Sequence, residues 1–232
     1  MVEAAGICKE YRRGRTVLRD ISFYGKPGEC VGIVGENGCG KTTLLSILAG
    51  ILKADGGRLS YFGQNILGNR KAIQKCTAYV PQENPLMEEL SVRDNLLLWY
   101  QGDRKKLDQD LKGGAAAMLG LSGHEKETAG KLSGGMKKRL SIACSLANHG
   151  RILIMDEPGA ALDLLCKETI RRYLEIYRRD GGIVILTSHD LMELKMCSRI
   201  YMMRDGVLKE LEKGFPVEQL PEMLVRPAAF EG

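Results

Sequence analysis

The chain has 232 residues, 44% of them hydrophobic and 27% charged, which is ordinary for a globular protein and excludes the disordered, collagen-like and coiled-coil classes. The 28 glycines and the 6% of aromatic residues favour an α/β protein, with many tight turns between strands and helices, over a β-sandwich. At this length one domain, or one domain with a small insertion, can bury its own core. The net charge of +5 permits contact with an anionic membrane or a nucleic acid but argues for neither, and we expect no nucleic acid partner.

Several features predict a cytoplasmic location. No apolar run approaches the ~20 residues that are needed to cross a bilayer, and the charged first residues lack the apolar core of a secretory signal. The seven cysteines form no Cys-x-x-Cys pair and show no metal-like spacing with the three histidines. This pattern fits a reducing compartment and mostly buried thiols.

Residues 1–80 alternate short apolar segments with turns. Five of these segments predict strands: residues 2–9, 17–24, 31–34, 58–62 and 76–80. Turns are expected at residues 13–14 and 27–28, which contain glycine next to arginine or proline. A glycine-rich loop follows the third strand, and a helix over residues 41–49 comes next, which Gly50 ends.

The pattern changes over residues 84–131, where polar and helix-prone segments replace the strands. Ser91 is placed to cap one helix there, and residues 104–121 form another helix-prone stretch. These segments together predict a small helical insertion in the α/β fold.

Strand patterns then return at residues 151–155, 183–187 and 199–203. A helix capped by Asp163 lies between the first two strands, and residues 205–206 predict a hairpin turn. Because strands alternate with helices, we expect an α/β fold with a mainly parallel sheet that helices cover on both sides.

Residues 35–42 match the phosphate-binding pattern G-x-x-x-x-G-K-[ST], after a predicted strand and before a predicted helix, as the pattern requires. Glycines let successive backbone N–H groups point at phosphate oxygens, and the start of the helix adds positive potential. The residues expected around the phosphates are Gly35, Glu36, Asn37, Gly38, Cys39, Gly40, Lys41, Thr42 and Thr43. Lys41 would reach the β- and γ-phosphates of ATP and act in catalysis, and the Thr42 hydroxyl would ligate Mg²⁺.

Two acidic residues follow the apolar strand predicted at residues 151–155. The carboxyl ends of parallel strands meet bound ligands at one edge of a sheet. Asp156 would hold Mg²⁺ through water, and Glu157 would polarise the water that attacks the γ-phosphate. Taken alone, Glu157 could equally be a solvated residue or a helix cap, but its place beside Asp156 and a phosphate loop favours the catalytic role.

Residues 132–136 read Leu-Ser-Gly-Gly-Met and lie between the two nucleotide motifs. Together with those motifs, the segment makes the chain resemble the nucleotide-binding subunits of ATP-binding cassette (ABC) transporters over roughly residues 1–212, and among them the export-type (ABC-2-like) group. The resemblance implies a P-loop NTPase with an N-terminal antiparallel β-subdomain and a small helical insertion. It divides the chain into a core with the β-subdomain, a helical subdomain and a C-terminal tail, at residues 1–83 with 132–212, 84–131 and 213–232.

In this family two such domains pack head to tail around two ATP molecules. The resemblance implies that Ser133, Gly134 and Gly135 bind the γ-phosphate of the ATP that the partner's phosphate loop holds, since a helix N-terminus attracts an anion. Residues 161–163 match the loop that crosses the dimer interface. The partner would be a second copy of this chain or a paralogue, and a monomer should hydrolyse ATP poorly.

The resemblance implies roles for three further residues. Tyr11 would stack on adenine, although it could also be a surface tyrosine on a strand. Gln82 would contact Mg²⁺ and link the site to the membrane subunit, and its plainer interpretation is a polar loop residue. His189 matches the switch histidine that contacts the γ-phosphate. His124 and His149 have no such context, and we interpret both as surface or packing residues.

Three residues depart from the usual pattern of the family. Cys39 stands where serine is more usual, and as a thiol beside a helix N-terminus we expect it to be acidified and reactive, with ATP protecting it. Met136 replaces a common glutamine, and residues 132–143 resemble the version found in exporters. Gly159 replaces a threonine or serine. None of these changes removes a catalytic group.

The leading hypothesis is an ATPase subunit, with ATP and Mg²⁺ as cofactors, that drives a separate membrane permease from the cytoplasmic face of the cell membrane. The small insertion and the lack of a long C-terminal regulatory domain favour export. The alternative is a soluble ABC ATPase that remodels a ribosome, DNA or an iron–sulfur assembly. A GTP switch or a small-molecule kinase would share only the phosphate loop, and the chain has no Asn-Lys-x-Asp motif to read guanine.

Overall fold

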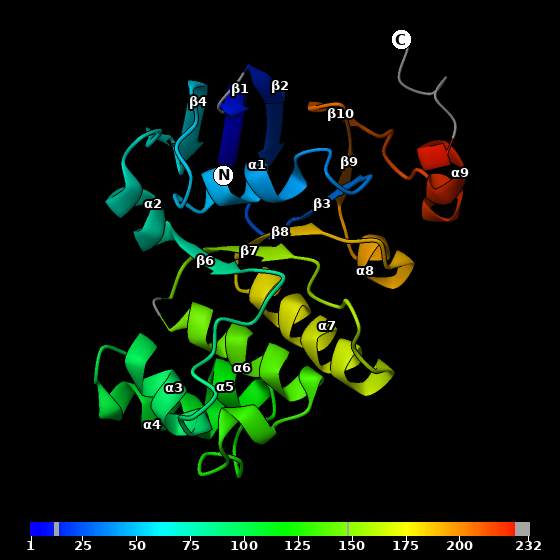
Figure 1. Cartoon of the computed structure of the whole chain (residues 1–232). Helices are drawn as coiled ribbons and strands as arrows, with labels where there is room; N and C mark the ends of the chain where they lie inside the picture. The colour runs from blue at the N-terminus through cyan, green and yellow to red at the C-terminus, as the bar shows by residue number, and fades with distance from the viewer. Residues whose placement is uncertain (12–13, 148, 226–232) are drawn as a thin grey trace.

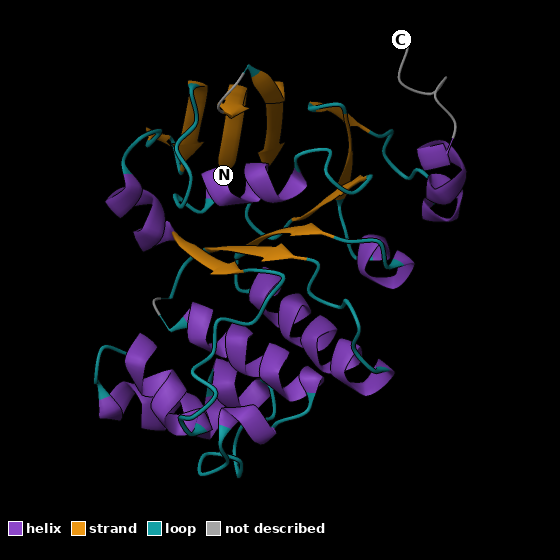
Figure 2. Cartoon of the chain, viewed as in Figure 1, coloured by secondary structure: helices purple, strands orange, loops and turns teal. Residues whose placement is uncertain are grey.

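The computed structural model describes residues 1–11, 14–147 and 149–225. The turn predicted at residues 13–14 and the tail predicted at 213–232 therefore lie partly outside the described residues. The described chain forms two sheets with helices around them (Figure 1; Figure 2 separates helices from strands by colour). No helix of this part of the chain is long and apolar enough to cross a membrane.

The larger sheet has six strands in the order β10-β9-β3-β8-β7-β6. They are β3 (Cys30–Gly35), β6 (Thr77–Val80), β7 (Ile152–Asp156), β8 (Ile183–Thr187), β9 (Arg199–Arg204) and β10 (Val207–Glu210). Neighbours pair in parallel, except that β9 and β10 form the hairpin predicted at residues 205–206. Every residue of β3, β7 and β8 is buried, which explains why these strands are continuous apolar runs. The predicted parallel core sheet is confirmed.

The smaller sheet is antiparallel and has the strand order β2-β1-β4-β5. Its strands are β1 (Val2–Tyr11), β2 (Arg15–Gly25), β4 (Gly56–Tyr61) and β5 (Gln64–Asn65). The start of β1 alternates buried and exposed side chains, as expected of a sheet with one face in the core. The sheet confirms the predicted antiparallel β-subdomain, and β1 extends beyond the predicted segment as far as Tyr11.

Helices cover both faces of the larger sheet. They are α1 (Lys41–Leu48), α2 (Arg70–Cys76), α3 (Val92–Trp99), α4 (Arg104–Gly113), α5 (Ala115–Met118), α6 (Gly134–Leu146), α7 (Leu164–Arg179), α8 (Leu191–Lys195) and α9 (Leu220–Val225), with 3₁₀ turns η1 (Ala129–Lys131) and η2 (Val217–Gln219). Figure 1 shows α1 between the two sheets, whereas α6 and α7 lie on the opposite face of the larger sheet. The α3, α4 and α5 helices pack beyond α6 and form the predicted helical part.

The helix starts follow the side-chain caps expected from the sequence. Ser91 Oγ accepts the Asp94 N–H at 3.0 Å, and Asp163 accepts the Cys166 N–H at 2.8 Å. The stretch predicted at residues 104–121 is instead two helices, α4 and α5, which are separated at Gly114. The Asp110 side chain of α4 reaches across this break. Its carboxylate accepts the Ala116 N–H at 3.0 Å, and a Cβ atom at Gly114 would lie 2.0 Å from the same carboxylate.

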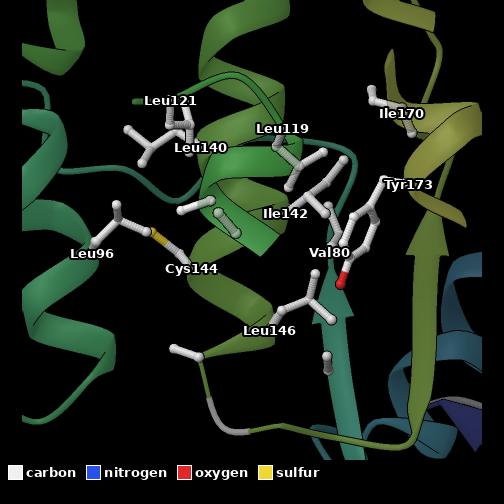
Figure 3. Packing of buried hydrophobic residues seen from close by; sticks show 14 of the residues in the cluster. Val80, Leu96, Leu119, Leu121, Leu140, Ile142, Cys144, Leu146, Ile170 and Tyr173 are labelled. Carbon is white, nitrogen blue, oxygen red and sulfur yellow. The ribbon is translucent and has the colours of Figure 1, made fainter. Parts of the chain in front are cut away.

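The apolar core is divided by the larger sheet into one layer on the α1 side and one on the α6 side. In the α6-side layer, Leu96 of α3 points toward Cys144 of α6, and Leu140 packs nearby (Figure 3). This layer also includes Val80 of β6 and Tyr173 of α7. It therefore joins the helical insertion to the sheet that carries the nucleotide motifs.

Leu96 and Leu98 of α3 provide a matched test of this joint, since Leu96 is 0% exposed and Leu98 is 57% exposed. Leu96→Ala leaves a cavity and should lower the free energy of unfolding by about 2–5 kcal/mol. Leu98→Ala should change it by less than about 0.5 kcal/mol. Denaturant unfolding of both variants measures the difference, and equal losses would contradict the packing described here.

Candidate active site

The loop between β3 and α1 is shaped to leave backbone N–H groups unpaired at a helix start. Gly40 precedes α1 with φ 115°, and no side chain caps the helix. A Cβ atom at Gly35 would lie 2.2 Å from the Met203 carbonyl oxygen, so only glycine fits there. The first N–H groups of α1 are thus available to an anion, and the helix dipole favours one there.

Lys41 lies inside this loop and holds it together. The side chain is 6% exposed, and its Nζ donates to the carbonyl oxygens of Gly35 at 2.7 Å and Glu36 at 3.0 Å. An ammonium group has three donors, so one N–H remains beyond these two hydrogen bonds. A positive charge is therefore fixed where the sequence predicts phosphate.

Asp156, the last residue of β7, links this strand to the start of α1 and to the end of β8. Its carboxylate, 2% exposed, accepts hydrogen bonds from the hydroxyl groups of Thr42 at 2.7 Å and Thr187 at 2.6 Å. Carboxylate, hydroxyl and phosphate oxygens are the ligands that Mg²⁺ prefers. The oxygen atoms of Thr42 and Asp156 therefore fit this ion. The structure brings these two predicted residues into contact.

Glu157 follows directly and presents its carboxylate to two predicted residues. Gln82 Nε2 lies 3.4 Å from Glu157 Oε2, and His189 Nε2 lies 3.4 Å from Oε1. The Glu157 backbone has φ 46°, an uncommon value for a residue other than glycine, and its N–H donates to the Thr187 hydroxyl at 3.0 Å. The chain turn after β7 thus aims this carboxylate between Gln82 and His189.

A cavity of about 500 Å³ connects these groups. It is lined by Tyr11, Arg15, Val17, Asn37, Gly38, Gly40, Lys41, Thr42, Thr43, Gln82 and Glu157. Tyr11 is 44% exposed, and its hydroxyl lies 3.4 Å from Thr43 Oγ1. The position of Tyr11 is compatible with stacking on a bound base.

Two residues of this cavity, Arg15 and Val17, were missed by the sequence analysis. They lie on β2, and Arg15 pairs with Tyr11 in the hairpin of β1 and β2. The strands predicted at residues 2–9 and 17–24 stopped short of this pair, and extending both of them toward the predicted turn is the signal that could have found Arg15.

The Leu-Ser-Gly-Gly segment lies away from this cavity. Ser133 caps α6, accepting the Met136 N–H at 3.2 Å, and Ser133 and Gly134 are exposed. Gly135 is buried against α7, and a Cβ atom at this position would lie 2.7 Å from Cys166 Sγ. None of the three lines the cavity, and α6 and α1 lie on opposite faces of the sheet (Figure 1). The structure does not bring these three predicted residues to the chain's own phosphate loop.

The prediction of an acidified Cys39 thiol was wrong. Burial raises the pKa of the Cys39 thiol above its usual value, and the nearby positive charge of Lys41 opposes this effect without reversing it. A helix start lowers a thiol pKa only where desolvation is small, and here the side chain is enclosed by the phosphate loop.

Gly159, which departs from the family pattern, lies against the end of a glutamate side chain. A Cβ atom at this position would lie 2.2 Å from Glu193 Oε1 of α8. Glu193 also accepts the Ser188 hydroxyl at 2.5 Å, and burial raises the pKa of its carboxyl group. The Glu193 carboxyl group therefore fills the space that a larger residue 159 would need.

Comparisons with known proteins agree with this geometry. The sequence model of the family described as ABC transporter matches residues 18–160. The chain belongs to the ABC transporter family. It carries the ATP-binding cassette of these ATPases, so the recognition made from the three motifs is confirmed.

Similar proteins include transport subunits of both directions. The Nod factor export ATP-binding protein I of Rhizobium sp. (strain N33) is 31% identical over 93% of this chain and 71% of its own length. The spermidine/putrescine import ATP-binding protein PotA of Mycoplasma mycoides is 33% identical over 94% of this chain, which spans 62% of that relative's length.

Solved structures of ABC cassettes also resemble the chain. The dimeric bacterial ABC transporter cassette MJ0796 has a TM-score of 0.82 at 26% identity, covering 92% of this chain and 98% of that one. A post-hydrolysis dimer of the same cassette with ADP and Pi has a TM-score of 0.79 at 27% identity, over the same shares of both chains.

The raised pKa of Cys39 has a measurable consequence. The thiolate is the form that reacts with N-ethylmaleimide. At pH 7 the reagent should therefore react with Cys39 more slowly than it reacts with N-acetylcysteine. As the pH is raised, the rate of Cys39 modification should increase only at a higher pH than the rate for the free thiol. Mass spectrometry of the labelled peptide measures the rate, with Cys39→Ser as the control. Modification at pH 7 as fast as that of the free thiol would contradict the effect of burial.

Proposed function

We propose that the chain is the ATP-hydrolysing subunit of an ABC transporter and that it works as one half of a head-to-tail pair of cassettes around two Mg–ATP. The observation that carries this proposal is the separation of Ser133 from the cavity beside Lys41, on opposite faces of one sheet. A second cassette, turned around, could supply the exposed start of α6 to this cavity. Leu164 and Leu165, directly after residues 161–163, are largely exposed. These apolar side chains support a protein partner next to residues 161–163.

In this mechanism the predicted site residues divide between binding the nucleotide and acting in hydrolysis. The N–H groups of residues 35–43 and the Lys41 ammonium bind the β- and γ-phosphates, and Tyr11 stacks on adenine. Thr42, Asp156 and Gln82 would hold Mg²⁺, directly or through water, and a bound ion would supply positive charge to the phosphates.

Glu157 is the general base. It takes a proton from the water that attacks the γ-phosphorus, the bond to the bridging oxygen breaks, and ADP leaves. Gln82 and His189, each 3.4 Å from this carboxylate, orient it, and His189 contacts the γ-phosphate. The partner's Ser133, Gly134 and Gly135 would complete the charge stabilisation from the far side.

The second partner in this proposal is a membrane permease on a separate chain, which holds the cassette at the cytoplasmic face of the membrane. The helical part at residues 84–131 would contact it, and the core at residues 1–83 and 132–212 would bind nucleotide. This contact is supported by three apolar side chains that are exposed on the helical part, Met87, Leu98 and Trp99. Similarity to transport subunits also favours the permease.

Glu157→Gln tests the base and the pairing together. Turnover should fall by roughly 10²–10⁴-fold, the usual contribution of a general base, while ATP binding persists. Light scattering should then show a shift from monomer to dimer on addition of ATP and Mg²⁺, because the closed pair is no longer opened by hydrolysis.

Lys41→Ala is the contrasting variant, since it should weaken ATP binding itself. Full turnover in Glu157→Gln would remove Glu157 from the base role. A monomer that still binds ATP would instead point to a paralogous cassette or to a need for the permease.

For the direction of transport we favour export. Support comes from residues 132–143 and from the Nod factor export relative, while the PotA import relatives are of similar identity. In vesicles that carry the permease, ATP added on the side of this chain should drive cargo away from that side. Movement of cargo toward the chain would establish import.

A further inference from the structure

Lys138 is a buried lysine that the nucleotide-binding cavity does not use. It lies in the second turn of α6 and is 3% exposed. Its Nζ donates to the carbonyl oxygens of Pro81 at 2.9 Å and Gln82 at 3.1 Å, directly after β6. A lysine is rarely buried this completely unless its charge is paired, so its surroundings need an explanation.

The charge of Lys138 is balanced by acidic residues around the site. Burial lowers the pKa of the Lys138 ammonium, and the carboxylates of Asp156, Glu193 and Glu157 oppose that effect. These carboxylates come from the end of β7, the residue after it, and α8. A neutral side chain at position 138 would leave them without this cation and would also remove the donor to two partly buried carbonyl groups.

The two carbonyl groups belong to the segment that carries Gln82. The Gln82 backbone is held by Lys138, and its side-chain amide lies 3.4 Å from Glu157 Oε2. The same α6 helix is capped by Ser133, which is exposed and does not line the chain's own cavity. One side chain therefore connects the helix of the Ser-Gly-Gly segment to the residue beside the proposed base.

We propose that Lys138 is a positioning residue for ATP hydrolysis. It fixes the Gln82 backbone to α6, so that a shift of α6 moves the Gln82 amide relative to the Glu157 carboxylate. The inference rests on the proposed function, because it takes Glu157 as the group that acts on water.

The first test is the effect of Lys138→Met on steady-state hydrolysis. This variant keeps the apolar stem of the side chain and removes the ammonium, so kcat should fall at least tenfold. The Kd for ATP should change less than twofold, because the hydrogen bonds of Lys138 go to the backbone after β6 and not to the phosphate loop. Lys138→Arg restores donors and charge and should recover most of the lost kcat.

Two neighbours on α6 are matched controls. Ser145 also links α6 to β6, since its hydroxyl donates to the Tyr79 carbonyl oxygen at 2.8 Å, but this carbonyl group lies within the strand and not at Gln82. Lys137 carries the same charge as Lys138 and pairs with the exposed Glu88 at 2.7 Å. Ser145→Ala and Lys137→Met should both keep kcat within about twofold. A fall in Ser145→Ala equal to that in Lys138→Met would reduce Lys138 to a general support of the α6–β6 contact.

A double-mutant cycle with Gln82→Ala separates positioning from simple loss of structure. If Lys138 acts through Gln82, Lys138→Met should reduce kcat less than twofold further in the Gln82→Ala background. Multiplicative losses would overturn the proposal, as would a Lys138→Met variant with normal kcat. Thermal unfolding of each variant confirms that the compared proteins are folded.

The outcome is distinguishable from failure of the proposed function. Full turnover in Glu157→Gln would overturn the proposed base. Multiplicative losses in the cycle between Lys138 and Gln82, together with an inactive Glu157→Gln variant, would overturn only the role of Lys138.

Discussion

The buried carboxylate of Asp156 is the interaction on which the site depends. It accepts one hydrogen bond from Thr42 at the start of α1 and one from Thr187 at the end of β8, and so holds two neighbouring elements against its own strand. These groups can meet because β3, β8 and β7 are adjacent and parallel, which places their carboxyl ends at one edge. A shift of one residue between β7 and β8 would point Asp156 to the other face of the sheet and separate it from Thr42.

The same sheet explains why the start of α6 does not reach the cavity beside α1 in its own chain. Helix α1 begins after Gly40 without a side-chain cap, helix α6 is capped by Ser133, and the two helices lie on opposite faces (Figure 1). A rigid sheet filled with apolar side chains on both faces cannot fold back to bring them together. Hydrogen bonds from Lys138 to the Gln82 backbone and from the Gln82 amide to Glu157 join α6 to the lining of the cavity.

Local patterns predicted the parts of this protein that depend on a few consecutive residues. The phosphate loop, the caps Ser91 and Asp163, and the hairpin at residues 205–206 were all recognised, because each is formed by hydrogen bonds or glycine geometry within one short segment. The break within residues 104–121 was not, since it depends on the Asp110 carboxylate accepting a bond from a later residue.

Other features depended on neighbours that are distant in the sequence. The pKa of Cys39 follows from how deeply the folded loop encloses it, and the helix start alone predicted the opposite direction. Gly159 looked like a neutral departure until Glu193, from another element, was found in the space beside it.

The sequence by itself determined the α/β class, the ABC motifs and which residue types could meet phosphate and Mg²⁺, because these follow from composition, periodicity and short spacings. Only the tertiary structure decided that Glu157 lies between Gln82 and His189, and that Ser133 lies outside the cavity of its own chain. It also decided that Lys138 is buried against the Gln82 carbonyl group. The physical reason is that burial, and the distances between residues far apart in the chain, are set by strand order and packing across the sheet, which no local segment encodes.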